Sequence, residues 1–245
     1  MQYNRLAELY DRLMSEVDYD AWANYLLSFV PASSLILECA CGTGEMTLML
    51  AKAGHKVTAT DISDDMLRIA SEKLRLSGPA GRNVRFAQMD MRSVSAHKPV
   101  DCVVSCCDGV NYLLSREDVK MFFSSAYSAL KPGGLLLFDI SSRYKLSHVL
   151  GDNCFVNNED PTPYMWQNTY DEQSKLIKMD LSFFIKKGDL FERFDETHIQ
   201  RAHSEKEILN WLSDCGFSAE AYDCFTRSDA LPDSERIQFV ARKEI

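Results

Sequence analysis

The sequence lacks a hydrophobic run long enough to cross a membrane, and it lacks an excess of positive charge. No stretch of its 245 residues approaches the ~18–20 consecutive apolar residues that a membrane span needs. The N-terminal stretch "MQYNRLAELYDRLM" carries acids and arginines among its apolar positions, unlike a signal peptide. Lys and Arg number 27 against 36 Asp and Glu, for a net charge of −9. A cytoplasmic protein without a membrane partner is therefore expected. Nucleic acid is not expected as a partner, because surfaces that bind it are normally basic.

The eight cysteines lack the spacing of a metal or redox site. No C-x-x-C pair occurs, and the "CAC" at 39–41 has no second pair and no histidines to complete a zinc site. Disulfides are not expected without an export signal. Most of the cysteines lie in apolar runs, where cysteine acts as a small buried hydrophobe. We therefore expect no metal.

Short β-rich runs alternate with helical patterns over the first 140 residues, which predicts parallel β-α-β units. The expected strands are continuously apolar, as in a sheet that helices cover on both faces. The strands are expected at 35–39, 56–60, 84–89, 100–106 and 135–140, and the helices at 47–53, 64–76 and 116–130.

The pattern changes after residue 140. An irregular stretch reaches residue 163, and three closely connected β-like runs then predict an antiparallel meander between about 164 and 202. Ser204 and Glu207 have the spacing of a helix-capping box. After that helix, two last strands are expected at 217–225 and 237–242.

A glycine turn, "CGTGEM" (41–46), joins the first strand to the first helix. Gly42 and Gly44 have no side chain to keep a ligand away from the backbone N–H groups. Glu38, Asp61 and Asp90 end the first three strands. Ligands of open parallel sheets bind beyond these carboxyl ends. One carboxylate there can accept hydrogen bonds from both hydroxyls of a ribose, and another from an adenine amino group.

The turn lacks the third glycine of a dinucleotide-binding motif, since Thr47 follows "GTGEM". Its acidic surroundings would repel a diphosphate and attract the ammonium group of a methionine moiety. S-adenosylmethionine therefore fits the pattern better than NAD.

Four stretches resemble, in order, the motifs of class I S-adenosylmethionine-dependent methyltransferases: "LILECACGTGEMTLMLA", "VTATDISDDML", "VRFAQMDMRSV" and "LKPGGLLLFDI". Two positions depart from the family pattern, because Ala40 replaces its first glycine and Glu38 its commoner aspartate. "ECACGTG" looks closest to small-molecule branches such as sugar N-methyltransferases, in which a β insertion supplies the acceptor site. The final third also resembles a bacterial cytosolic branch.

The resemblance implies an α/β fold with a Rossmann-like seven-stranded sheet, parallel except for its last strand. Helices would cover both faces, and an antiparallel β insertion would lie between the fifth and sixth strands. We expect N-terminal helices and the cofactor-binding part of the core in 1–140, the insertion as an acceptor lid in 141–203, and the completion of the core in 204–245.

The resemblance also implies S-adenosyl-L-methionine as cofactor, with S-adenosyl-L-homocysteine as product. The glycine turn would line its methionine side, Asp61 its ribose, the residues after the second and third strands its adenine, and those after the fourth its sulfonium. Tyr10 would close over the cofactor or, alternatively, only pack its helix on the sheet. Asp90 has the alternative of capping a helix. The implied cofactor residues are Tyr10, Glu38, Ala40, Gly42, Gly44, Asp61, Ile62, Met66, Asp90, Met91, Cys106 and Asp108.

Methyl transfer from a sulfonium is an in-line displacement in which alignment supplies much of the rate. A base is needed only when the acceptor arrives protonated. In "RFDETHIQR" (193–201), Glu196, His198 and Gln200 share one face of a strand. We expect His198 and Glu196 to orient and deprotonate the acceptor, unless this face is simply solvated; His198 has the unperturbed pKa nearest neutrality. Further acceptor contacts are expected from Asn111, Tyr112, Trp166, Tyr170 and Arg201. Alternatively, Trp166 and Tyr170 belong to the core and Arg201 pairs with a surface carboxylate.

The expected function is methyl transfer to nitrogen or oxygen of a small-molecule acceptor by a monomer or homodimer. An RNA or protein methyltransferase is the first alternative, and it would need a basic patch or a peptide groove. A non-catalytic module of the same fold that binds the cofactor is the second.

Overall fold

A seven-stranded sheet forms the core of the computed structural model, which describes residues 7–158 and 162–244. The strand order is β10-β11-β5-β4-β1-β2-β3. β1 to β5 pair in parallel, whereas β11 runs antiparallel to both of its neighbours. The predicted seven-stranded sheet with an antiparallel last strand is therefore confirmed. The strands are β1 (Leu35–Cys39), β2 (Lys56–Asp61), β3 (Val84–Gln88), β4 (Val100–Ser105), β5 (Leu130–Ser141), β10 (Phe217–Asp223) and β11 (Arg236–Lys243).

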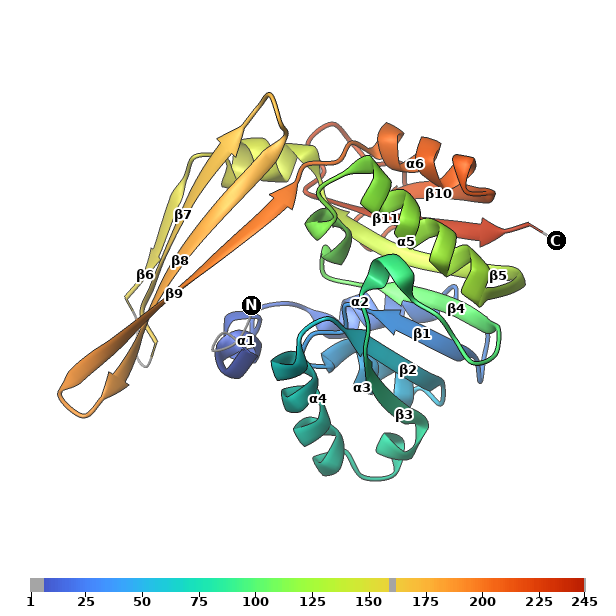
Figure 1. The fold of residues 1–245 in the computed structure, drawn as a ribbon, viewed down its shortest axis with the longest axis horizontal. Coiled ribbons are helices and arrows are strands. Elements are labelled where there is room, and N and C mark those ends of the chain that lie inside the picture. Colours follow the sequence, from blue (N-terminus) through green and yellow to red (C-terminus); the bar gives the residue numbers. More distant parts are fainter. Residues whose placement is uncertain (1–6, 159–161, 245) are drawn as a thin grey trace.

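Helices cover both faces of this sheet (Figure 1). Trp22 and Leu50, from α2 and α3, belong to the buried apolar cluster on one face, and Phe122 and Trp211, from α5 and α6, to the cluster on the other. The inner strands β1 and β4 are buried along most of their length, which explains why they are mostly apolar. The helices are α2 (Tyr19–Leu27), α3 (Glu45–Lys52), α4 (Asp64–Leu76), α5 (Arg116–Ala129) and α6 (Glu205–Asp214).

Two local expectations have clear outcomes. The capping box at the start of α6 is present, with Ser204 and Glu207 each bonding the other's backbone N–H. β5 begins at Leu130, five residues earlier than expected, because "KPGG" joins the strand through an irregular pairing with β4. Within the described ranges, no helix combines the length and apolar character that a membrane crossing requires.

All eight cysteines are free. Cys39, Cys102 and Cys106 are buried in the two core clusters or against them, as expected of small apolar residues. Cys154 is exposed. The packing interpretation therefore holds for the core strands and does not extend to Cys154.

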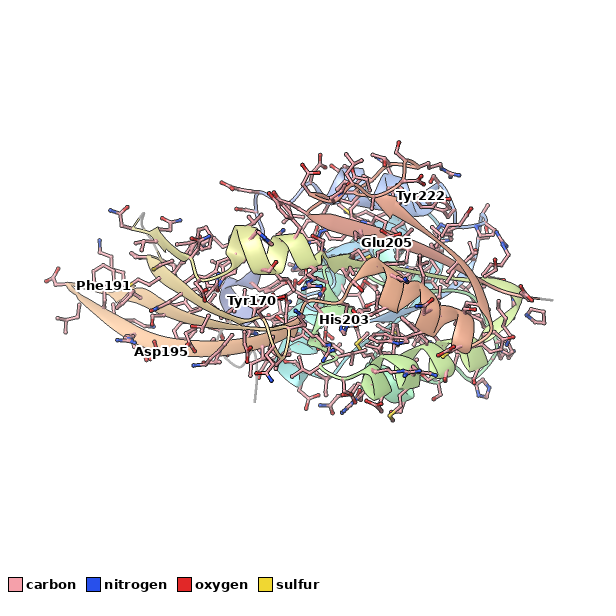
Figure 2. The ribbon with its side chains drawn as sticks, turned by 90° about the horizontal axis from the view of Figure 1, so that it is seen from above. Tyr170, Phe191, Asp195, His203, Glu205 and Tyr222 are labelled. Carbon is pink, nitrogen blue, oxygen red and sulfur yellow. The ribbon has the colours of Figure 1, made fainter. Side chains whose placement is uncertain are left out.

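A second sheet projects from the core as an arm (Figure 1). Its antiparallel strands are β6 (Cys154–Asn157), β7 (Tyr164–Asp171), β8 (Leu176–Lys187) and β9 (Leu190–Arg201), in chain order. Figure 2 shows Phe191 and Asp195 toward the far end of the arm and His203 near its junction with the core. The expectation of an irregular stretch over 141–163 is wrong for β6 and for the helical turn η4 (Lys145–Leu150). Both are too short to show a periodic pattern.

The helix α1 (Ala7–Leu13) connects the core to the arm. The hydroxyl of Thr43 donates to the Asp11 carboxylate at 2.5 Å, and Lys73 pairs with the same carboxylate at 2.6 Å. On the other side of α1, Leu9 packs against Phe183 of the arm. α1 is therefore held across the gap between the two sheets.

Candidate functional site

A cavity of about 470 Å³ lies between the carboxyl ends of the core strands, α1 and the inner face of the arm. This volume is typical of pockets for small molecules. The predicted residues that line it are Tyr10, Glu38, Ala40, Gly42, Asp61, Ile62, Met66, Met91, Cys106, Asp108, Tyr112, Trp166 and His198. Those outside its lining are Gly44, Asp90, Asn111, Tyr170, Glu196 and Arg201.

The two glycines of the turn have different surroundings. Gly42 has a φ of +55°, and a Cβ built on it would meet only the Tyr10 ring, at 4.0 Å. A Cβ on Gly44 would lie 3.0 Å from the Cβ of Ala70, so Gly44 allows α3 and α4 to pack closely. Ala40 also has a left-handed φ, 52°, which costs an L-residue about 1–2 kcal/mol. The backbone at position 40 therefore has the left-handed conformation that favours glycine, although the residue there is alanine.

Asp61 is held at the end of β2 by two backbone N–H groups. Gly42 donates to its Oδ2 at 2.8 Å and Ser63 to its Oδ1 at 2.9 Å. Burial raises the pKa of Asp61, and these N–H groups act in the opposite direction. A carboxylate offers about four lone pairs, so Asp61 can accept a further hydrogen bond beside those of its backbone partners, which include the Ile62 N–H.

Glu38 is buried at the end of β1, where its Oε2 accepts a hydrogen bond from the Thr47 hydroxyl at 2.6 Å. Burial raises the pKa of Glu38 to about 8; the Thr47 hydrogen bond opposes this rise and the nearby Asp61 adds to it. The cavity therefore contains a carboxyl group that is largely protonated at neutral pH and that a positive ligand would ionise.

Asp108 is fixed in a buried network after β4. It has a left-handed φ of 53°, and its N–H donates to Asp139 at 3.0 Å. Its carboxylate pairs with Arg236 at 3.0 Å and accepts from Gln200 at 2.7 Å. Arg236 also pairs with Asp139. The network joins β4, β5, β9 and β11 beside the cavity.

Arg236 and Asp139 were missed at the sequence level. Asp139 stands in the apolar run "LLLFDI", and a buried acid normally has a partner. That signal points to Asp139 alone, because its partner lies 97 residues further along the chain. Burial raises the pKa of Asp139 to about 6, while Arg236 acts to lower it.

His198 and Tyr112 meet at the arm side of the cavity. The Tyr112 hydroxyl lies 3.4 Å from His198 Nδ1, and the two rings are nearly perpendicular. His198 and Gln200 are buried, whereas Asp195 and Thr197 on the opposite face of β9 are exposed. Burial lowers the pKa of His198. This face of β9 is therefore directed at the core and is not a solvated face.

Asn111 and Asp90 make contacts within the protein. Asn111 Nδ2 donates to the carbonyl groups of Ser141 and Arg201 at 3.0 and 2.9 Å, and its Oδ1 accepts from the Ser141 N–H at 2.9 Å. Asn111 thus joins the end of β5 to the end of β9. Asp90 caps the short helix η2 (Met91–Ser93) and pairs with Arg92 at 2.5 Å.

The remaining residues of the cavity wall come from the core, from the N-terminal helices and from the arm. The strand β8 contributes alternate apolar side chains, and the period-two pattern of "IKMDLSF" (177–183) was the signal that could have found them. The wall residues that were not predicted include Tyr19, Leu150, Tyr164, Met179, Leu181 and Phe183.

Comparison with known proteins agrees with this geometry. A methyltransferase domain family matches residues 36–134. The putative methyltransferase YqeM of Bacillus subtilis is 38% identical over 245 residues, which cover 99% of this chain and 98% of that protein. A solved S-adenosylmethionine-dependent methyltransferase from Clostridium acetobutylicum is 32% identical, with a TM-score of 0.88 over 99% of both chains. CalS10, an amino pentose methyltransferase of Micromonospora echinaspora solved with S-adenosylmethionine bound, shares the fold with a TM-score of 0.72 and 17% identity, over 99% of this chain and 98% of that one.

The chain belongs to the class I S-adenosylmethionine-dependent methyltransferases. It is a methyltransferase enzyme, and its cofactor is S-adenosylmethionine.

The cavity fits this cofactor chemically. Two acids, Glu38 and Asp61, end neighbouring parallel strands in its wall, and the glycine turn between them carries no basic side chain for a diphosphate. Ile62 is an apolar residue that is 61% exposed, and it lines the cavity together with Met66 and Met91.

Proposed function

We propose that this enzyme transfers the methyl group to a nitrogen or oxygen atom of a small-molecule acceptor. The observation that carries the proposal is the composition of the cavity wall, in which core acids and arm side chains line one space of about 470 Å³. The amino pentose methyltransferase with the same fold acts on a small molecule. The net charge of −9 argues against RNA as the acceptor.

Each part of the cofactor has a suitable partner in the wall. The remaining acceptor capacity of Asp61 suits the ribose hydroxyls. Glu38 suits the methionine ammonium group, which would favour the ionised carboxylate. We assign the adenine to the apolar surface of Ile62 and Met91, because Asp90 is held by its own arginine partner. Tyr10, on α1, closes the cavity above Gly42.

The bound cofactor supplies a methyl group that is already activated on a sulfonium, so the protein's main task is alignment. We assign to His198 the role of taking the proton that a hydroxyl or ammonium group of the acceptor gives up. Its lowered pKa keeps the imidazole neutral, and thus able to accept that proton, at neutral pH. Tyr112 holds the imidazole from the core side. Glu196 lies two residues before His198 on the same face of β9, closer to the far end of the arm.

Calorimetric titration with S-adenosylhomocysteine tests the cofactor half of the proposal. The wild-type chain should bind it in the micromolar range. Asp61→Ala should weaken binding about a hundredfold, since it removes hydrogen bonds to a charged group. Asp64→Ala, which removes an exposed acid three residues away, should leave the affinity unchanged.

Absence of binding by the wild-type chain would reject the proposed function. Equal affinities of the two aspartate variants would reject the role of Asp61. Thermal melting of each variant identifies a loss of affinity that comes from unfolding.

A further inference from the structure

We propose that the acceptor is a flat aromatic molecule, with its ring on the inner face of the arm and its reacting hydroxyl or amino group at His198. This inference rests on the proposed function and names the acceptor class of the same cavity. It follows from three observations: the apolar side chains on the inner face of the arm, the protein side chains that pack against them, and the hydrogen bonds of the nearby amide side chains.

The inner face of β8 is apolar along its middle. Residues 177, 179, 181 and 183 share this face because side chains of a strand alternate. They are Ile177, Met179, Leu181 and Phe183, and the intervening residues are Lys178, Asp180 and Ser182. Three of the four apolar residues line the cavity. The arm therefore presents the cavity with an apolar surface.

Protein side chains cover the two ends of this surface but not its centre. At the far end, Phe183 packs with Leu9 of α1. At the base, Ile177 packs with Leu146 of η4. Leu181 contacts both clusters at their edges and is only half-buried. The uncovered part of the apolar face is thus centred on Leu181 and opens into the cavity.

Aromatic side chains border this centre. Trp166 lies directly opposite Leu181 on β7, and Tyr164 lies opposite Phe183. Both line the cavity. The Trp166 ring is supported by Phe155 of β6, with 5.6 Å between ring centroids. Aromatic rings attract one another beyond the effect of burial alone, so this surface favours a flat ring.

The amide side chains at the base of the arm are engaged elsewhere. Gln200 donates to Asp108 at 2.7 Å, and Asn168 donates to the Leu150 carbonyl at 3.2 Å. Asn111 is committed to the backbone of β5 and β9. A buried sugar needs a partner for each hydroxyl, since an unpaired one is costly. Asn111 and Asn168 do not line the cavity, and Gln200, which does, is held by Asp108, which disfavours a sugar.

The geometry also places the reacting group. His198 lies directly opposite Met179 on β8, one inner-face position from Leu181. That step along a strand is about 7 Å, close to the width of an aromatic ring with its substituent. A ring on Leu181 therefore presents a hydroxyl or amino group to His198.

Ligand-observed NMR on the full chain loaded with S-adenosylhomocysteine tests this acceptor class. The probes are 2-naphthol, as a flat aromatic alcohol, and glucosamine, as an amino sugar. We expect saturable binding of 2-naphthol and none of glucosamine. Binding of glucosamine alone, or of neither probe, would overturn the inference. The proposed function would still stand in that case if calorimetry shows that S-adenosylhomocysteine binds. Failure to bind S-adenosylhomocysteine would reject the proposed function itself.

A matched pair of variants locates the binding surface. Leu181→Asn should raise the Kd for 2-naphthol about tenfold, because it makes the uncovered centre polar. It should leave the affinity for S-adenosylhomocysteine within about twofold, since Leu181 belongs to the arm. Leu190→Asn makes the same change at an exposed position of the arm outside the cavity and should leave both affinities unchanged. An unaltered Kd in Leu181→Asn would overturn the inference, and if that variant does not fold, the wild-type comparison of the two probes decides.

Discussion

Replacing Glu38 by glutamine should make the free energy of unfolding less sensitive to rising pH. Glu38 is 2% exposed, and burial raises its pKa from 4.5 to about 8. A folded state that binds a proton more tightly than the unfolded chain loses stability as pH rises. The contribution of Glu38 is therefore complete below about pH 4.5, decreases as pH rises, and is lost by about pH 8. Glutamine keeps the shape and an oxygen for the Thr47 hydroxyl but has no proton to lose.

The size of the effect follows from the two pKa values. Each pKa unit corresponds to about 1.4 kcal/mol, so the full change is on the order of 5 kcal/mol. Between pH 5.5 and 7.5, the free energy of unfolding of the wild type should fall by about 3 kcal/mol more than that of Glu38→Gln. Asp139 titrates in both proteins, so its contribution cancels in this difference.

Urea denaturation followed by circular dichroism at these two pH values measures the difference. Glu16→Gln is the control, because Glu16 is exposed outside the cavity, and it should follow the wild type. A pH dependence of Glu38→Gln equal to that of the wild type would refute the reasoning. It would mean that Glu38 is ionised in the folded protein at neutral pH.

Two more substitutions test residues on the arm side of the cavity. His198→Gln should lower kcat about a hundredfold with unchanged affinity for S-adenosylhomocysteine. In the wild type, protonation of His198 lowers the rate at acidic pH, and His198→Gln should remove this fall. The control His148→Gln, which replaces an exposed histidine on η4, should retain it. An unchanged pH profile in His198→Gln would reject the role of His198 as base. Asn111→Ala should lower the free energy of unfolding by about 3 kcal/mol, because it leaves buried backbone groups of β5 and β9 unpaired. A loss below about 1 kcal/mol in urea denaturation would show that Asn111 does not join the two strands.

Much of the core fold could be predicted from the sequence because its inner strands, such as β1 and β4, are mostly apolar. Such runs, with helices between them, predict a parallel sheet covered on both faces. β6 could not be found in this way. It has four residues, too few to show alternation, and its pairing depends on β7, a neighbour supplied by the fold.

The cofactor side of the site was more predictable than the acceptor side. Glu38 and Asp61 could be placed together because parallel strands bring their carboxyl ends to one edge. The contacts of Asp108 with Gln200 and Arg236 join residues 92 and 128 positions apart, and no local pattern connects them. Asp90 was predicted as an acid at the end of a strand, and the sequence gave no sign that Arg92 would form a hydrogen bond with it.

Transfer of radiolabelled methyl groups tests the central claim most directly. The protein is incubated with methyl-labelled S-adenosylmethionine and a cell extract, which is then separated into small molecules, RNA and protein. We expect the label in the small-molecule fraction, at a level that depends on the added enzyme and is lost with Asp61→Ala. Label confined to RNA or protein, or no transfer at all, would contradict the account.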